Sequence, residues 1–173
     1  MLLGWGPTKI SFTPRYSVIV GGKMAANDMI KIRMVRPDEM PIIIDIENRC
    51  FPDPYPLSLL QRLYATNPYG FLVAELDGKV VGYLIGAVRW GASGHIMAIA
   101  VYPEYRHRGI GTALIVHMLD TLRMRGARHI RLEVRKSNVA AQQFYQKLGF
   151  RLGEEIPYYY EDGETAIAMF REF

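Results

Sequence analysis

The sequence predicts one α/β domain. Three observations support this fold class. The 173 residues suit a single domain, which at this length buries enough surface to fold without disulfides or metals. Half of the residues are hydrophobic and 22% are charged, which is typical of globular proteins. Apolar residues alternate in some segments and recur at helical spacing in others.

Composition excludes several classes of protein. Seven Phe, eleven Tyr and two Trp in a chain of modest charge exclude a disordered protein. No apolar run approaches the roughly 18 residues of a membrane span, so no membrane partner is expected. Cys50 is the only cysteine, which excludes an intrachain disulfide and a multi-cysteine zinc site. It also suits a reducing compartment, and the predicted location is cytoplasmic.

The N-terminal part of the chain differs from the rest. Residues 1–28 show no sustained period and are expected to form a loosely ordered extension, with residues 29–173 as the single domain. The alternating residues 30–35 predict its first strand. Pro37 and the acids after it suit the first turn of a helix that continues to Cys50.

A shaped loop, a short helix and a hairpin follow. Three prolines within residues 51–56 cannot continue a helix and predict the loop. Residues 57–65 then form a second helix. The apolar runs 71–76 and 80–88 flank Asp77-Gly78, which is a strong β-hairpin signal.

The second half alternates strands and helices. Residues 95–101 predict a strand buried on both faces, and residues 109–124 predict a long helix with an apolar stripe that Gly126 ends. The remaining predicted elements are strands at 130–134, 150–153 and 165–170 and a helix at 139–148. The predicted order is therefore β-α-α-β-β-β-α-β-α-β-β, with about four helices.

Charge is unevenly distributed along the chain. Residues 102–151 hold ten Lys or Arg and three acids, a net charge of +7, whereas the rest of the chain carries −3. This asymmetry suggests an anionic ligand, either a nucleic acid or a phosphorylated cofactor. A solvated basic helix face is an equally good interpretation of charge alone.

One short stretch predicts a phosphate site. Gly109 and Gly111 lie where the long helix begins, lack a Cβ and let the backbone approach a ligand closely. The first N–H groups of a helix have no internal partner and attract anions, and Arg106 and Arg108 add positive charge. A P-loop does not fit, because Gly111-Thr112-Ala113 stands where that motif needs Gly-Lys-Ser/Thr. A dinucleotide fingerprint does not fit either, because Leu114 stands where it needs glycine. The alternative is a tight turn that packs against a strand.

The motifs of residues 30–173, taken in their order along the chain, resemble those of the GNAT acetyltransferase superfamily. The resemblance rests on the strand at 95–101, Arg106-x-x-Gly109-x-Gly111, the long helix, Ser137-Asn138, Phe144-Tyr145 and Leu148-Gly149-Phe150. Four stretches are more specifically similar to N-terminal (Nα) acetyltransferases of the archaeal and eukaryotic NatA catalytic type, and less closely to bacterial RimI. These stretches are residues 51–55, 94–96, 132–138 and 159–166.

The resemblance implies acetyl-CoA as co-substrate. It also implies a GNAT fold of the α+β kind, in which a mixed and mostly antiparallel sheet splays at the acetyl-CoA site. The residues that it assigns to the pyrophosphate are Arg106, His107, Arg108, Gly109, Ile110, Gly111 and Thr112. It implies that Ile99, Ala100 and Val101 present backbone groups to the acetyl and pantetheine arm, and that Asn138 and Tyr145 lie near its reactive end.

The resemblance also implies catalytic roles. Glu133 is the candidate base, His95 a relay for the proton through water, and Tyr145 the acid that protonates the departing thiolate. Alternation alone favours a solvent-facing Glu133 paired with Arg131, since the two share a strand face. His95 has the alternative of a surface residue at a strand end, and Tyr145 that of a core aromatic. His95 and Glu133 are too few ligands to predict a metal.

The acceptor end is expected to be a slot with two walls. Its candidate residues are Phe51, Asp53, Tyr55, Tyr159 and Tyr160. The tyrosines at 55 and 160 are expected to hydrogen-bond an acceptor peptide, and the carboxylate at 53 to sense its charge. The alternative for residues 158–160 is an apolar contact surface.

The predicted function is therefore transfer of an acetyl group from acetyl-CoA to protein N-termini, by direct attack in a ternary complex. A lysine or small-amine acetyltransferase on the same fold is the alternative within enzymes. An RNA- or ribosome-binding or CoA-sensing module is the alternative outside them. A ribosome or an auxiliary subunit is a possible partner, and no specific nucleic acid is predicted.

Overall fold

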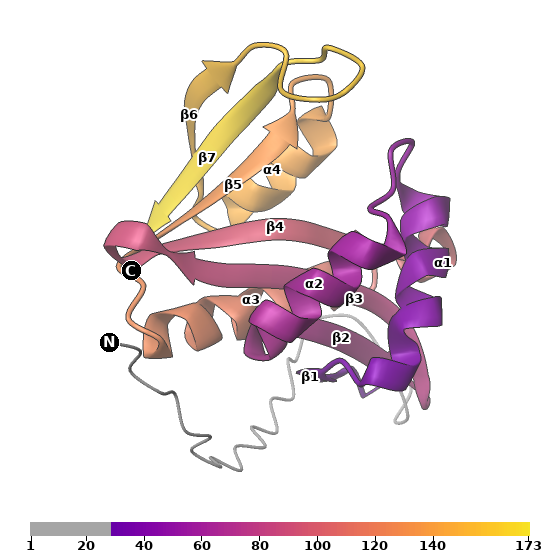
Figure 1. The fold of residues 1–173 in the computed structure, drawn as a ribbon. Helices are drawn as coiled ribbons and strands as arrows, with labels where there is room; N and C mark the ends of the chain where they lie inside the picture. Colours follow the sequence, from indigo (N-terminus) through magenta and orange to yellow (C-terminus); the bar gives the residue numbers. More distant parts are fainter. Residues whose placement is uncertain (1–28) are drawn as a thin grey trace.

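The computed structural model describes residues 29–173, in which seven strands form one sheet in the order β1-β2-β3-β4-β5-β7-β6 (Figure 1). The strands are β1 (Lys31–Met34), β2 (Phe71–Leu76), β3 (Lys79–Arg89), β4 (Ser93–Val101), β5 (His129–Arg135), β6 (Arg151–Ile156) and β7 (Ala166–Glu172). The helices are α1 (Met40–Cys50), α2 (Leu57–Thr66), α3 (Ile110–Met124) and α4 (Val139–Lys147). The predicted extension, residues 1–28, lies outside the described residues.

The sheet is mixed and mostly antiparallel, as predicted. All neighbouring strands are antiparallel except β4 and β5, which are parallel. That parallel pairing is short: Ser93, Gly94 and His95 face His129, Ile130 and Arg131. Beyond His95 the two strands diverge, and Figure 1 shows them parting like the arms of a V. The split leaves one edge of β4 without a strand partner.

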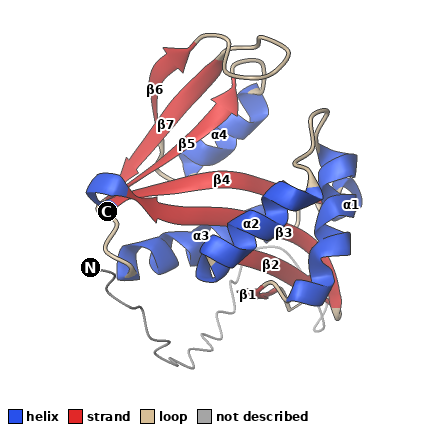
Figure 2. Ribbon diagram, in the orientation of Figure 1, coloured by secondary structure: helices blue, strands red, loops and turns tan. Residues whose placement is uncertain are grey.

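Helices cover both faces of the sheet (Figure 2). One core lies under α1 and α2, where Ile43, Ile46 and Leu60 pack with Phe71 and Tyr83 of the sheet. The other lies under α3 and α4 and contains the buried stripe of α3 together with Tyr145 and Phe150. No helix within residues 29–173 combines the length and apolar character that a membrane crossing requires.

The predicted element order is confirmed, with two local corrections. The strand predicted at residues 95–101 is not buried on both faces: His95, Met97 and Ile99 are half-buried, because β5 turns away from them. The strand predicted to stop at 153 continues to Ile156. Five of the six residues of β6 are exposed, so this edge strand carries no apolar alternation that could mark its end.

Candidate active site

The open edge of β4 exposes backbone groups. The N–H of Tyr102 donates to the carbonyl of Val81 on β3 at 3.0 Å, which fixes the direction of its neighbours, since backbone groups alternate along a strand. Ala100 therefore faces β3, opposite Tyr83, whereas the polar groups of Ile99 and Val101 face the split. Of the three residues predicted to present backbone to a ligand, Ile99 and Val101 do so and Ala100 is used within the sheet.

The carbonyl of Val101 is already occupied. It accepts a hydrogen bond from the Arg106 Nε at 3.1 Å and one from the Cys50 Sγ at 3.5 Å. These contacts fix the position of the Arg106 side chain at the end of β4. The N–H groups of Ile99 and Val101 are the backbone donors of β4 that face the opening in the sheet here.

A row of backbone amides precedes α3. Among the described residues, the N–H groups of residues 107–112 have no backbone partner, because the first bond of the helix runs from the Ala113 N–H to the Gly109 carbonyl, at 3.0 Å. Gly109 has φ 79°, a left-handed conformation that suits glycine. The side chains of Arg106 and Arg108 are exposed beside it. This arrangement of amides, positive charge and helix N-terminus fits a pyrophosphate.

Gly111 also lies in close packing, but against a helix rather than against the strand that the alternative interpretation named. A Cβ at this position would lie 3.4 Å from the ring of Phe144 on α4. The close approach of α3 to α4 and the exposed amides therefore occur together at this turn.

Glu133 and His95 form the polar centre of the site. Because His95 pairs with Arg131 across the β4–β5 junction, Glu133 lies on the same face just beyond the last paired residue. The His95 Nε2 is 2.7 Å from the Glu133 Oε2, and the Arg131 Nε is 2.6 Å from the Glu133 Oε1. Glu133 thus makes the contact with Arg131 that alternation suggested, but its side chain is only 9% exposed rather than solvent-facing. The catalytic role that the resemblance implies stays a prediction.

Both oxygens of Glu133 accept hydrogen bonds in this arrangement. Burial by itself raises the pKa of Glu133, but the hydrogen bonds from His95 and Arg131 outweigh it and lower that pKa below its usual value. The carboxylate is therefore ionised at neutral pH. The ring of His95 can donate to it from Nε2 in the tautomer that carries the proton there, and the Nδ1 of that tautomer has a lone pair that can accept a proton.

Tyr145 is buried on α4, with the edges of its ring against Phe144 and Phe150. Burial, and to a smaller extent the nearby phenol of Tyr160, raise the pKa of Tyr145. The phenol therefore keeps its proton and is available as a donor. Asn138 lies at the start of the same helix, where its Oδ1 accepts the N–H of Ala141 at 3.0 Å and caps α4.

The two predicted walls of the acceptor slot approach Glu133. We call residues 51–56 the first wall and residues 158–164 the second wall. In the first wall, the Tyr55 hydroxyl reaches the carbonyl of Met97 on the open edge of β4, at 3.4 Å. In the second, burial raises the pKa of Tyr159, and the charges of Glu133 and Tyr55 add to the effect. Glu133 is thus close enough for its charge to act on one tyrosine of each wall, Tyr55 and Tyr159.

Two further residues hold the walls, and the sequence did not single them out. Glu47 on α1 is 2% exposed and accepts the N–H of Tyr55 at 2.7 Å. Arg135 at the end of β5 contacts Asp53 of the first wall and Asp162 and Glu164 of the second. Glu47 carried a signal, because it is a charged residue on the apolar face of its helix. Nothing in the strand pattern distinguishes Arg135 from a solvent-facing arginine.

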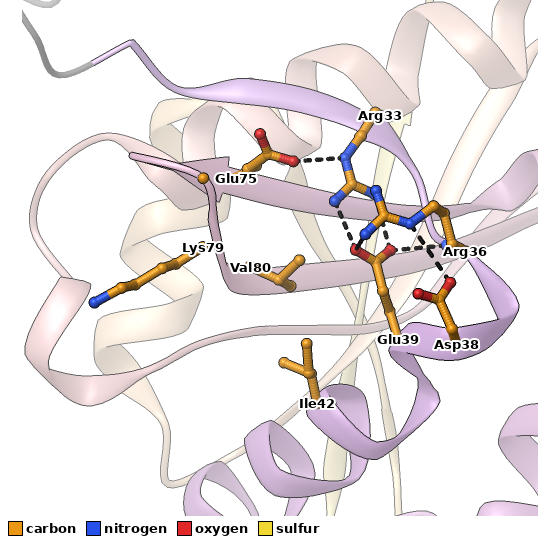
Figure 3. Close-up of a pocket in the computed structure, with 9 residues that line it drawn as sticks. Arg33, Arg36, Asp38, Glu39, Ile42, Glu75, Lys79 and Val80 are labelled. Carbon is orange, nitrogen blue, oxygen red and sulfur yellow. Dashed lines mark hydrogen bonds and ion pairs between the residues drawn. The ribbon is translucent and has the colours of Figure 1, made fainter.

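A separate depression lies where β1 meets the start of α1, and Figure 3 shows that ion pairs fill it. Arg33 pairs with Glu39 at 2.6 Å and with Glu75 at 2.8 Å, and Arg36 pairs with Glu39 and Asp38. None of the predicted site residues lines it. Within residues 29–173 no three His, Cys, Asp or Glu side chains are grouped to hold a metal ion, and the metal-free site stays a prediction.

Comparison with known proteins shows the same architecture. Residues 40–150 match the family described as Acetyltransferase (GNAT) family. An uncharacterized N-acetyltransferase of Methanocaldococcus jannaschii is 42% identical over 82% of this chain and 90% of its own length. An N-alpha-acetyltransferase of Sulfurisphaera tokodaii is 36% identical over 80% of this chain and 90% of its own. The crystal structure of Ard1 from Thermoplasma volcanium superposes with a TM-score of 0.79, at 30% identity over 83% of this chain and 97% of that one.

Proposed function

The chain belongs to the acetyltransferase (GNAT) family, and from this premise we propose that it transfers the acetyl group of acetyl-CoA to the α-amino group of protein N-termini. The acceptor amine attacks the thioester directly while both substrates are bound. The observation that carries the proposal is the Glu133–His95 pair, which lies where the sheet splits, between the open edge of β4 and the two walls. A relative that is 36% identical and named N-alpha-acetyltransferase supports the choice of acceptor.

The chain's own groups would bind acetyl-CoA at two points. The amides of residues 107–112, with Arg106 and Arg108, would hold the pyrophosphate. The N–H of Ile99 would donate to the acetyl carbonyl, and this bond would strengthen as the carbonyl oxygen becomes negative in the transition state. Acetyl-CoA supplies the activated acyl group.

The Glu133–His95 pair would act as the base. An α-amino group has a pKa of about 7.7–8.0, so roughly a tenth of it is already neutral at pH 7. The His95 Nδ1 would take the proton of the attacking amine, directly or through one water, while Glu133 stabilises the resulting imidazolium. As the nitrogen–carbon bond forms and the carbon–sulfur bond breaks, the thiolate would take the Tyr145 proton.

The test measures thiol release from acetyl-CoA with two matched peptides. One peptide has a free Ser N-terminus and no lysine, and the other has a blocked N-terminus and one lysine. Turnover of the first alone is expected. Turnover of the second alone would move the acceptor to lysine on the same fold. Turnover of neither, together with salt-sensitive RNA binding, would contradict the proposal and favour a binding module.

A further inference from the structure

Arg135 touches both walls of the proposed acceptor slot. Its Nη2 lies 3.1 Å and 3.3 Å from the two carboxylate oxygens of Asp53, in the first wall. Its Nη1 lies 2.8 Å from carboxylate oxygens of both Asp162 and Glu164, in the second wall. Its guanidinium also covers the ring of Tyr160, 4.0 Å from the centroid. One side chain of β5 therefore joins segments that are about a hundred residues apart in the chain.

The second wall is anchored independently of Asp53. The other carboxylate oxygen of Glu164 accepts the N–H of Ser137 at 2.9 Å, next to the cap of α4. The contacts with Ser137 and with Arg135 hold the pKa of Glu164 at about 2, so this carboxylate stays charged throughout the neutral range. Glu164 consequently holds Arg135 in place in the second wall. From there Arg135 contacts Asp53, whose side chain is 34% exposed, compared with 26% for Glu164.

The contact changes what the slot presents to an acceptor. The carboxylate of Asp53 was expected to sense the charge of the incoming peptide, yet both of its oxygens face the guanidinium of Arg135. A single guanidinium nitrogen that bridges both oxygens of a carboxylate offsets part of its charge and restricts its orientation. Arg135 shares its one positive charge among Asp53, Asp162 and Glu164, so the charge of Asp53 is offset in part by this chain.

We propose that Arg135 is a positioning residue that ties the two walls together and offsets part of the charge of Asp53, so that the slot selects less strongly for a basic second residue in its acceptor. This inference rests on the proposed function, because the slot is the acceptor site of that reaction. A free Asp53 carboxylate would attract an arginine at the second position and repel a glutamate.

The test compares acceptor peptides that begin with Ser and carry Arg, Ala or Glu at the second position, without lysine. Arg135→Gln is expected to raise the KM for all three while leaving the KM for acetyl-CoA within about twofold, because the amide row is elsewhere. It is also expected to shift the ratio of kcat/KM for the Arg peptide over the Glu peptide by about threefold to fivefold, the range of an exposed ion pair. Asp53→Asn added to Arg135→Gln should return that ratio toward the native value, although not fully, because Asp162 and Glu164 also lose their contacts with Arg135.

Matched controls separate this role from a general effect on folding. Lys136 is the neighbour of Arg135 and pairs with Glu155 on β6 at 2.8 Å, without reaching the first wall. Lys136→Gln should change neither the KM nor the peptide ratio. A ratio that stays native in Arg135→Gln, or that is shifted as far in the double variant as in Arg135→Gln, would overturn the proposal.

A measurement without turnover covers the case in which the proposed function itself fails. Hydrogen exchange of the unliganded protein should quicken in both residues 51–56 and residues 158–164 of Arg135→Gln, and in neither segment of Lys136→Gln. Native exchange in residues 51–56 of Arg135→Gln would refute the tie between the walls. Absence of N-terminal acetylation by the native protein, with quickened exchange in Arg135→Gln, would refute the acceptor and the peptide selectivity but keep the tie.

Discussion

At the scale of single residues, the charge of Glu133 can be removed without changing its shape. Glu133→Gln leaves a side chain of the same size but weakens the hold on His95 and the stabilisation of its protonated form. We expect kcat to fall on the order of 100-fold, with the KM for acetyl-CoA unchanged, because the carboxylate does not belong to the amide row. Steady-state kinetics with a Ser-initiated peptide measures both constants.

A control variant and a second variant of a proposed catalytic residue accompany Glu133→Gln. Glu154 contacts the same arginine, Arg131, at 3.1 Å from an exposed position, and Glu154→Gln should retain native turnover. Tyr145→Phe should lower kcat by a similar order as Glu133→Gln, since it removes the donor proposed for the thiolate. Native kcat in both Glu133→Gln and Tyr145→Phe would show that neither side chain takes part in the chemistry.

Glu47 makes the stability of the protein depend on pH. Burial raises the pKa of Glu47 from 4.5 to about 7, although the N–H of Tyr55 opposes this rise. The folded protein therefore binds this proton more tightly than the unfolded chain, so stability falls as the pH rises from about 4.5 through about 7. The loss attributable to this group is on the order of 2–3 kcal/mol.

Glu47→Gln removes the titration and keeps an oxygen for the Tyr55 N–H. Denaturant unfolding at pH 5 and pH 8 should show a smaller loss of stability in the variant than in the native protein. Equal losses in the two proteins would mean that Glu47 does not bind a proton more tightly in the folded state.

At the scale of elements, the glycine before α3 can be compared with a glycine of similar backbone conformation in a turn far from the site. Gly109 has φ 79° in the predicted pyrophosphate loop, and Gly78 has φ 77° in the hairpin turn between β2 and β3. Alanine at either position is strained and should cost about 1 kcal/mol of stability. Only Gly109→Ala should also raise the KM for acetyl-CoA, by about tenfold, because it displaces amides that face the pyrophosphate.

Thermal unfolding and acetyl-CoA kinetics on the two glycine variants provide the comparison. If Gly109→Ala and Gly78→Ala alter the KM for acetyl-CoA equally, the loop at residues 107–112 is not the phosphate site.

The elements differ in how far the sequence could predict them. The hairpin at Asp77-Gly78 was predictable, since both residues have the positive φ that this turn requires, 49° and 77°. The helix α3 was predictable from its apolar stripe. The end of β6 was not, because an exposed edge strand shows no alternation. The divergence of β4 from β5 came from the family resemblance, since no property of either strand alone sets where their pairing ends.

The residues of the candidate site also differ in how far the sequence could predict them. The amide row and Glu133 lie within a continuous stretch or a regular strand, so pattern and resemblance located them. Arg135 depends on Asp53 and Glu164, which only the folded chain brings together. Contacts between residues so far apart in the sequence leave no local periodicity, so the tie that Arg135 makes between the walls could be seen only in the structure.

At the scale of the whole molecule, the fold offsets part of the basic charge seen in the sequence. Three of the ten basic residues in the segment 102–151 pair with acids from outside that segment, namely Arg131, Arg135 and Lys136. The +7 of the segment therefore overstates the positive charge available to a polyanion. We expect no specific binding of RNA at physiological salt, measured by fluorescence titration with a short single-stranded RNA. Sub-micromolar binding there would contradict this expectation.

Whether the site acetylates an α-amine can be measured with a single peptide. The peptide carries a free Ser N-terminus and an internal lysine, so that both amines compete for the same enzyme and acetyl-CoA. Fragmentation by mass spectrometry then locates the added acetyl group. We expect acetylation at the N-terminus with the lysine unmodified, and loss of this acetylation in Glu133→Gln. Acetyl groups found mainly on the lysine would show that the acceptor is not the α-amine.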